Sequence, residues 1–396
     1  MHELIALLLP GGDDLVAAVR RAWDAGDAVL PLDPDAPRAH LGQVMQALSP
    51  TAVVEAGGGL RRLAGGRPVE AGDALVIATS GTTGAPKGAV HTFHSVEHAA
   101  YASSTAAGVA PDTRWLACLP LSHVGGFSVV SRALVTGAGL DVHARADADA
   151  IDDAAERGAT HVSLVPTLLD RIDATRWRTI LLGGSAIPAS RPSNTIATYG
   201  MTETMGGVVY DGLALNGVEV RVVDPAAPEA SPRAARPGEQ GPIELRSPTL
   251  LRCYRDGTDP VRPDGWYRTG DLGRVDPRTQ HLTVLGRADD LIISGGEKVW
   301  PDPVEAILRT DHRVHDVAVV GRPDPEWGER VVAVVVAEDR NDPPSLQGLR
   351  DLVRAQLPRA AAPKELELVD SLPRTGLGKI RRSLLAASGS EHHPHG

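Results

Sequence analysis

A run rich in glycine, serine and threonine at residues 78–88 constrains this chain more than any other feature. Its sequence is ATSGTTGAPKG. The glycines allow backbone angles and close approaches that side chains would block, the hydroxyl groups offer donors, and Lys87 adds a positive charge. The segment therefore suits a polyphosphate. It departs from the Walker pattern, because it lacks the Lys-Ser or Lys-Thr pair that holds magnesium at a helix start.

Length and composition favour a soluble enzyme that acts on small molecules. The 396 residues exceed the usual size of one domain, so we expect two domains. A net charge of -10 argues against a nucleic-acid backbone or an anionic membrane surface as the main partner. Cys118 and Cys253 do not form a Cys-x-x-Cys pair, and we expect two buried apolar thiols.

Neither an export signal nor a run of about 18 apolar residues is visible, so we expect a cytoplasmic protein without membrane insertion. The sequence leaves the oligomeric state open, with a homodimer as one option. Residues 387–396 contain three histidines but no apolar pattern, and we interpret them as a disordered tail rather than a metal site.

Hydrophobic periodicity predicts an α/β protein with a smaller α+β module at its end. A helical pattern covers residues 14–30. Strands are expected at 74–78, 115–119, 218–223, 243–245, 316–321 and 331–337, and helices from 304 and over 345–357. The pattern changes after Gly286, which predicts a domain boundary near Ala288.

Seven segments in chain order resemble the motifs of the adenylate-forming superfamily, which comprises acyl-CoA synthetases, peptide-synthetase adenylation domains and luciferases. They are residues 78–88, 119–127, 183–186, 199–204, 267–273, 286–297 and 373–379. The resemblance implies a large N-terminal α/β domain over 1–287, which binds ATP and the acyl group, and a small mobile C-terminal domain over 288–386. It also implies ATP, Mg²⁺ and coenzyme A as the cofactors, and an acyl-adenylate made from a carboxylic acid before transfer to coenzyme A.

The resemblance assigns a nucleotide site. Its members at the phosphates, the adenine and the ribose are Ser80, Gly81, Thr82, Thr83, Gly84, Lys87, Gly183, Gly184, Ser185, Ala186, Tyr199, Gly200, Asp271 and Arg287. Asp271 would accept both ribose hydroxyls, and Tyr199 would stack on the adenine.

The catalytic set implied by the same motifs is Lys379, His123, Thr202 and Glu203. Glu203 matches the carboxylate that holds magnesium, which prefers oxygen ligands. Lys379 would stabilise the charge shared by the carboxylate and the α-phosphate. Asp289 takes the hinge position of a domain rotation, after which Gly295 and Gly296 leave room for the pantetheine arm. Asp290 is either part of that hinge or a structural cap.

The acyl site is expected to contain Arg132, His123, Gly125 and Gly207. Arg132 lies in an apolar stretch, where it either pairs with a structural carboxylate or binds a second carboxylate of the substrate. Its spacing from His123, together with residues 206–212, resembles the o-succinylbenzoate:CoA ligases of menaquinone biosynthesis. The alternatives are an aryl- or medium-chain acyl-CoA ligase, a stand-alone adenylation enzyme that serves a carrier protein, and a non-catalytic nucleotide sensor.

Two departures from the family pattern accompany these matches. The phosphate loop comes early in the chain, and residues 186–198 are short where the family has a helix. We expect the nucleotide site to survive both, whereas the wall of the acyl pocket near 186–198 should differ.

Overall fold

In the computed structural model, the described residues are 2–80, 86–185, 187–188, 190–228, 232–374 and 380–387. The chain divides into two compact units that interleave along the sequence. The first comprises residues 1–221, 244–268 and 276–282, and the second comprises 222–243, 269–275 and 283–396. The predicted boundary at 287/288 stays a prediction, because compactness alone assigns two earlier segments to the second unit.

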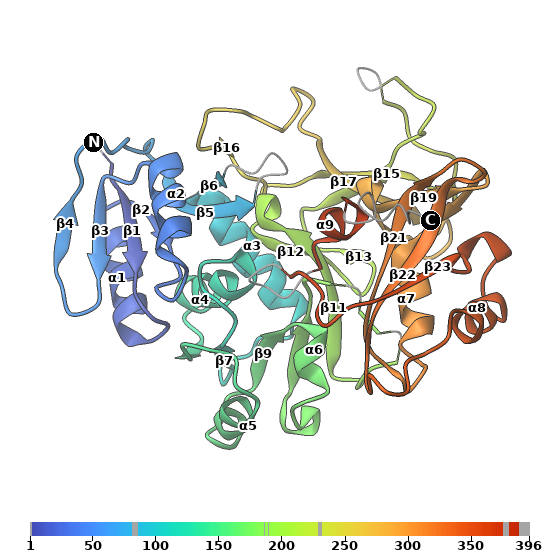
Figure 1. The fold of residues 1–396 in the computed structure, drawn as a ribbon. Helices are drawn as coiled ribbons and strands as arrows, with labels where there is room; N and C mark the ends of the chain where they lie inside the picture. Colours follow the sequence, from blue (N-terminus) through green and yellow to red (C-terminus); the bar gives the residue numbers. More distant parts are fainter. Residues whose placement is uncertain are drawn as a thin grey trace. The chain divides into compact units, whose positions relative to one another are not determined.

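The first unit begins with a seven-stranded sheet in the order β16-β6-β5-β2-β1-β3-β4. Strands β3, β1, β2 and β5 are parallel neighbours, and β4, β6 and β16 add antiparallel edges. Helices α1 and α2 lie beside it in the blue part of Figure 1. The bounds are β1 Leu4–Leu8, α1 Asp13–Asp24, β2 Ala28–Pro31, α2 Arg38–Leu48, β3 Ala52–Glu55, β4 Leu60–Arg62, β5 Asp73–Ser80, β6 Pro86–Thr92 and β16 Cys253–Tyr254.

A second seven-stranded sheet has the order β13-β12-β11-β10-β9-β7-β8. Strands β8, β7, β9, β10 and β11 are parallel, and β12 and β13 continue the sheet antiparallel. The bounds are β7 Arg114–Ala117, β8 Gly139–Val142, α5 Ala148–Glu156, β9 His161–Leu164, α6 Pro166–Leu169, η1 Ala174–Arg176, β10 Thr179–Leu182, β11 Thr195–Met201, η2 Thr202–Thr204, β12 Gly206–Tyr210 and β13 Leu213–Ala214.

Helices α3 (Phe93–Ala106) and α4 (Val124–Thr136) pack against each other. Helix α3 contacts β5 and β6 of the first sheet and β12 of the second, while α4 contacts β7, β8, β9 and β12 (Figure 1). This helix pair places side chains between the two sheets. Its interface contains the one arginine that the sequence analysis placed in the acyl site.

A four-stranded sheet, β14-β15-β17-β18, contributes residues to both units. The rest of the second unit is built on the long β21–β22 hairpin, with β19 and β20 at one side and β23 parallel to β22. The bounds are β14 Glu219–Val222, β15 Gly241–Arg246, β17 Tyr267–Val275, β18 Leu282–Arg287, η3 Ala288–Asp290, β19 Ile292–Ser294, β20 Glu297–Val299, α7 Pro301–Leu308, β21 Val314–Asp324, β22 Gly328–Ala337, α8 Leu346–Arg354, η4 Arg359–Ala361, β23 Glu365–Leu368 and α9 Arg382–Ala387.

The structure confirms the predicted fold class, a large N-terminal α/β part followed by a C-terminal α+β domain. The helix expected over 14–30 ends earlier. Gly26 has a φ of 76°, a left-handed value that breaks the helix, and the buried residues that follow form β2. Cys118 is buried as expected, whereas Cys253 is only half-buried at the sheet edge. Helix α9 includes Ala387, and the rest of the predicted tail lies outside the described residues.

Candidate functional site

The phosphate segment joins two antiparallel strands. Ser80 pairs with Pro86 at the end of the β5–β6 ladder, so residues 81–85 connect adjacent strand ends. The Nζ atom of Lys87 lies 5.2 Å from the centre of the Tyr254 ring. Of the predicted phosphate-binding residues, Gly81, Thr82, Thr83, Gly84 and the side chain of Ser80 lie outside the described part of the chain.

Glu203 stands in a one-turn 3₁₀ helix, η2, between β11 and β12. The Tyr254 hydroxyl donates a hydrogen bond of 2.8 Å to its Oε1 atom, and the backbone N–H of Leu251 donates to its carbonyl oxygen. Oε2 has no hydrogen-bond partner among the described residues. The carboxylate is therefore oriented through one oxygen while the other is available to a metal ion, which suits a hard cation such as Mg²⁺.

His91 fixes the same turn from the side of β6. Its Nε2 atom lies 2.7 Å from the Thr202 carbonyl oxygen, so this nitrogen must carry the proton. Burial lowers the pKa of His91 to about 4, against the opposing effect of that hydrogen bond. The buried Nδ1 atom has no partner among the described residues. A neutral imidazole therefore connects the phosphate hairpin to the Glu203 turn.

This arrangement predicts a loss of stability in acid. The folded-state pKa of about 4 lies below the usual 6.5, so the unfolded chain binds more protons, and stability falls as the pH drops from 6.5 towards 4. From pH 7.5 to pH 5 the free energy of unfolding should fall by about 2 kcal/mol from this group alone. In denaturant titrations, His91→Gln should show a correspondingly smaller loss. Exposed His94→Gln is the control, and equal pH slopes for wild type and His91→Gln would contradict the assignment.

The predicted adenine pocket lies at the carboxyl ends of two parallel strands. Gly183, Gly184 and Ser185 follow β10, and Tyr199 and Gly200 lie on β11, which pairs with β10 in parallel register. A Cβ atom at Gly183 would lie 2.6 Å from Thr198 Oγ1, so only glycine allows this close approach. Ligands of open α/β sheets bind at such strand ends. Ala186 lies outside the described residues, and the described residues between it and β11 form no helix, as the sequence predicts.

The residues predicted for the acyl site lie on or beside helix α4 and strand β12. A Cβ atom at Gly206 would lie 3.5 Å from Ser128 Cβ and 4.0 Å from Val124 Cγ2, so one face of α4 lies directly against β12. His123 precedes the helix at its N-cap. Burial lowers the pKa of His123, and His40 adds to this while Asp33 opposes it, so the imidazole is neutral at pH 7.

Gly125 lies in the first turn of the same helix, and Gly207 lies in β12 beside Gly206. A Cβ atom at Gly207 would lie 2.8 Å from the Tyr210 ring. The structure thus places His123 and Gly125 at the start of α4, and Gly207 in the strand that packs against this helix. Their contact with a substrate stays a prediction.

Arg132 is buried in α4, with 4% of its surface exposed. Its Nε–H donates to Ser103 Oγ at 2.8 Å, and its guanidinium carbon lies 4.5 Å from the centre of the Trp115 ring. No carboxylate pairs with it among the described residues, and its Nη1 atom is buried without a hydrogen-bond partner there. Burial lowers the pKa of Arg132, an effect that the nearby Tyr210 opposes. The described residues therefore offer no partner for the alternative interpretation, in which Arg132 forms a structural ion pair.

Two predicted nucleotide residues of the second unit contact each other. The Nη1 atom of Arg287 donates to the Thr269 carbonyl oxygen at 3.1 Å and lies 3.5 Å from Oδ1 of the buried Asp271. The predicted hinge residue, Asp289, lies in η3 with its side chain 80% exposed and 3.8 Å from Arg287 Nη2. Asp290 pairs with Arg382 at 3.4 Å, which supports its structural interpretation.

Gly295 and Gly296 form the turn between β19 and β20, with φ values of 63° and 80° that favour glycine. The Gly295 N–H donates to the Trp327 carbonyl oxygen. The preceding Ser294 is buried, and its hydroxyl accepts a hydrogen bond from Lys364 Nζ at 3.0 Å. The predicted catalytic Lys379 lies outside the described residues.

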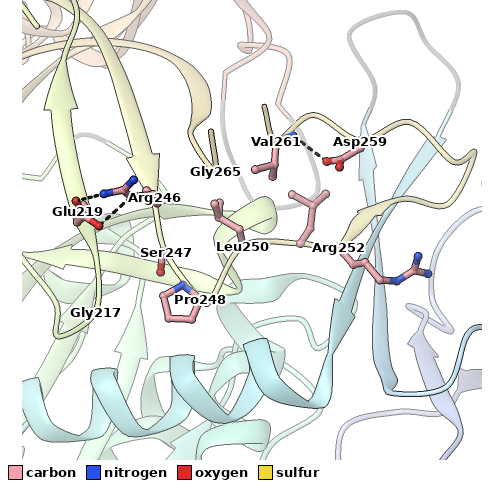
Figure 2. Close-up of a pocket in the computed structure, with 11 residues that line it drawn as sticks. Gly217, Glu219, Arg246, Ser247, Pro248, Leu250, Arg252, Asp259, Val261 and Gly265 are labelled. Atoms are coloured by element: carbon pink, nitrogen blue, oxygen red, sulfur yellow. Dashed lines mark hydrogen bonds and ion pairs between the residues drawn. The ribbon is translucent and has the colours of Figure 1, made fainter. Parts of the chain in front are cut away.

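A cavity of about 450 Å³ in the first unit contains none of the predicted site residues. Figure 2 shows Arg246 and Glu219 paired at its edge, and Leu250 pointing inward. The pairing neutralises the arginine, so this edge offers no net charge to a phosphate. Leu251, which also lines the cavity, donates its N–H to the Glu203 carbonyl oxygen, so the cavity wall supports the turn that carries Glu203.

Sequence reasoning missed the residues that hold the site from a distance. His91, Tyr254, Ser103 and Trp115 are 111, 51, 29 and 17 positions from their respective partners. No spacing rule connects residues so far apart. Their immediate neighbours gave no signal either, since Ser103 is followed by Ser104 and Thr105, and Tyr254 by Arg255 and Asp256.

Two family models match this chain. The family model described as AMP-binding enzyme matches residues 2–255, more than half of the chain, and the model of the AMP-binding enzyme C-terminal domain matches residues 303–379. The chain belongs to the AMP-binding enzyme family. In its described residues, this family member has no helix that is long and apolar enough to cross a membrane.

Among the relatives of this AMP-binding enzyme is a probable 2-succinylbenzoate--CoA ligase of Mycobacterium tuberculosis, 38% identical over 81% of this chain and 85% of the relative. An indoleacetate--CoA ligase of Aromatoleum aromaticum is 36% identical over 78% of this chain and 66% of the relative. The o-succinylbenzoate CoA synthetase of Bacillus subtilis, solved with the acyl-adenylate intermediate, has a TM-score of 0.84 at 26% identity, covering 100% of this chain and 89% of that chain. The same enzyme has been solved with ATP and a magnesium ion.

Proposed function

We propose that this AMP-binding enzyme is an ATP-dependent o-succinylbenzoate (2-succinylbenzoate):CoA ligase of menaquinone (vitamin K2) biosynthesis, an acid-thiol ligase. The acid's carboxylate attacks the α-phosphorus of ATP and pyrophosphate leaves. The thiol of coenzyme A then attacks the acyl carbon and AMP leaves. The observation that carries the substrate assignment is Arg132, a buried cation on the α4 face that meets β12, with no carboxylate partner among the described residues. The 38% identity to a 2-succinylbenzoate ligase supports it.

The nucleotide contacts that the family resemblance implies are compatible with the geometry above. Glu203 would hold Mg²⁺ through its available oxygen, and the metal would neutralise phosphate charge. Lys87 and the segment it belongs to would hold the phosphates. Tyr199 would stack on the adenine beside the Gly183 turn, and Asp271 would accept the ribose hydroxyls once its contact with Arg287 rearranges.

The two half-reactions need different groups at one acyl carbon. Lys379 would act in adenylation, with Thr202 beside the metal carboxylate and neutral His123 lining the acyl region. Rotation of the domain over 288–386 about Asp289 would then withdraw Lys379 and bring Gly295 and Gly296 to the acyl carbon, where coenzyme A enters. We further propose a cytoplasmic location, with a homodimer as the oligomer to test.

Fixing the hinge should separate the half-reactions. Asp289→Pro locks the φ angle of a residue whose exposed side chain makes only a distant ion pair, so folding should be little affected. Pyrophosphate release in a single turnover should stay within about twofold of wild type, while thioester synthesis should fall by about 100-fold, as expected of a blocked conformational step. Asp289→Asn removes the charge and keeps the backbone free, so it is the matched control. Normal thioester synthesis by Asp289→Pro would move the hinge elsewhere.

The function is tested by incubating the purified protein with ATP, Mg²⁺, coenzyme A and o-succinylbenzoate. Pyrophosphate, AMP and the thioester should form in equal amounts. The runner-up is an aryl-CoA ligase, which the 36% identity to an indoleacetate ligase supports. Turnover of indoleacetate or benzoates without turnover of o-succinylbenzoate would select it. Acyl transfer to a phosphopantetheinyl protein but not to coenzyme A would indicate an adenylation enzyme, and no ATP cleavage with any acid would indicate a sensor.

A further inference from the structure

We propose that Ser103 is a positioning residue for substrate recognition: it holds Arg132 through a neutral acceptor and so leaves the guanidinium charge to the substrate's second carboxylate. The inference rests on the proposed function, because it concerns the acid that Arg132 selects. Ser103 lies in α3 and Arg132 in α4, so a serine on a neighbouring helix would leave the arginine without a negatively charged partner.

The hydrogen bonds around Ser103 show how the acceptor is made. Ser103 lies in α3 with 3% of its surface exposed. Its hydroxyl donates to the Ala99 carbonyl oxygen one turn earlier in the helix. Because the single hydroxyl proton is used there, the oxygen can only accept from Arg132 Nε, at 2.8 Å. The serine therefore binds the arginine without contributing any negative charge.

The other side of the guanidinium is also closed by a neutral group. The Trp115 ring lies 4.5 Å from the guanidinium carbon, a distance typical of a cation–π contact. Tyr210 is buried as well and interacts electrostatically with Arg132. The Ser103 hydroxyl and the Trp115 ring therefore hold the guanidinium from two sides. Its Nη1 atom has no partner among the described residues.

Two other arginines are buried to a similar degree, and both have their terminal nitrogens bonded. Those of Arg322 contact Glu365 and Glu367, and those of Arg255 contact backbone carbonyl groups. Arg132 is different, since a charge is buried and one terminal nitrogen is unbonded in the described structure. A buried charge without a counter-ion lowers the stability of the folded protein. We expect such a charge where binding of an anion compensates for this loss of stability.

The position of Arg132 along helix α4 fits the predicted acyl site. Val124 and Ser128 contact the start of β12 at Gly206, and Arg132 follows one turn later on the same face of α4. Tyr210, at the other end of β12, interacts electrostatically with Arg132. An acid lying along this helix and strand, with its reacting carboxylate near Gly206, would place a second carboxylate towards Arg132.

The test compares two variants of nearly equal shape. Ser103→Asp gives Arg132 an internal counter-ion, whereas Ser103→Asn supplies a neutral acceptor of the same size. KM and kcat are measured for o-succinylbenzoate and for 4-oxo-4-phenylbutanoate, an analogue without the ring carboxylate. Ser103→Asp should raise the KM for o-succinylbenzoate at least about tenfold over Ser103→Asn, since the internal carboxylate repels and replaces that of the substrate. For the analogue, the two variants should agree within about twofold.

Equal effects of the Asp and Asn variants on both acids would overturn the proposal and make Ser103 a simple packing residue. If the larger side chains prevent folding, Ser103→Ala gives the answer: it should raise the KM for o-succinylbenzoate about threefold or more, with kcat and the analogue nearly unchanged. An equal effect of Ser103→Ala on both acids would also overturn it. Failure of the wild type to use o-succinylbenzoate refutes the proposed function instead, so the two failures are distinguishable.

Discussion

Lys379→Ala should lower the rate of acyl-adenylate formation by about 10²–10³, because removing one group that stabilises the transition-state charge typically costs that much. The conversion of a supplied acyl-adenylate to the thioester should stay within about threefold of wild type, since this lysine is proposed to act only before the domain rotates. Single-turnover pyrophosphate release measures the first half-reaction, and thioester formation from synthetic acyl-adenylate measures the second.

Arg381→Ala is the control for this lysine. It removes an exposed positive charge two residues away and should change neither half-reaction by more than about twofold. Equal losses in both half-reactions of Lys379→Ala would refute the division of roles, and would indicate that the lysine supports the folded domain or binds a nucleotide in both states.

Arg132→Ala should raise the KM for o-succinylbenzoate about 30-fold or more. A buried charged hydrogen-bond pair contributes on the order of 2–5 kcal/mol to binding, and 1.4 kcal/mol corresponds to about a tenfold change. The KM for ATP should barely change, because no described nucleotide residue contacts this guanidinium. Initial rates at varied acid and varied ATP provide both constants.

Arg132→Met separates charge from volume. Because Arg132 has no carboxylate partner in the described structure, Met should fill the space below Trp115 and leave the melting temperature unchanged or higher. Its KM for o-succinylbenzoate should rise as for Ala, and 4-oxo-4-phenylbutanoate should bind the wild type and both variants about equally poorly. A fall of many degrees in the melting temperature of Arg132→Met, or equal harm to both acids, would make Arg132 structural.

Local sequence was sufficient for most of the fold. The strands expected at 74–78 and 115–119 correspond to β5 and β7, and the pair expected at 316–321 and 331–337 forms the longer β21–β22 hairpin. Apolar runs and turn residues act over a few positions, so periodicity detects them. The helix predicted over 14–30 was too long, because the buried strand that follows it is as apolar as a buried helix face. The helix breaks at Gly26 because of the backbone angle of that glycine, which local periodicity does not reveal.

The motifs by themselves also determined the family, since each motif is a contiguous string, and they are the basis of the proposed two-step chemistry. Only the tertiary structure decided how those residues are held. Tyr254 reaches Glu203, and Ser103 reaches Arg132, across intervals that no local rule spans. Whether a buried arginine has a counter-ion depends on which helices and strands meet around it. That information is distributed over distant parts of the chain, so the absence of a carboxylate beside Arg132 in the described residues became visible only in three dimensions.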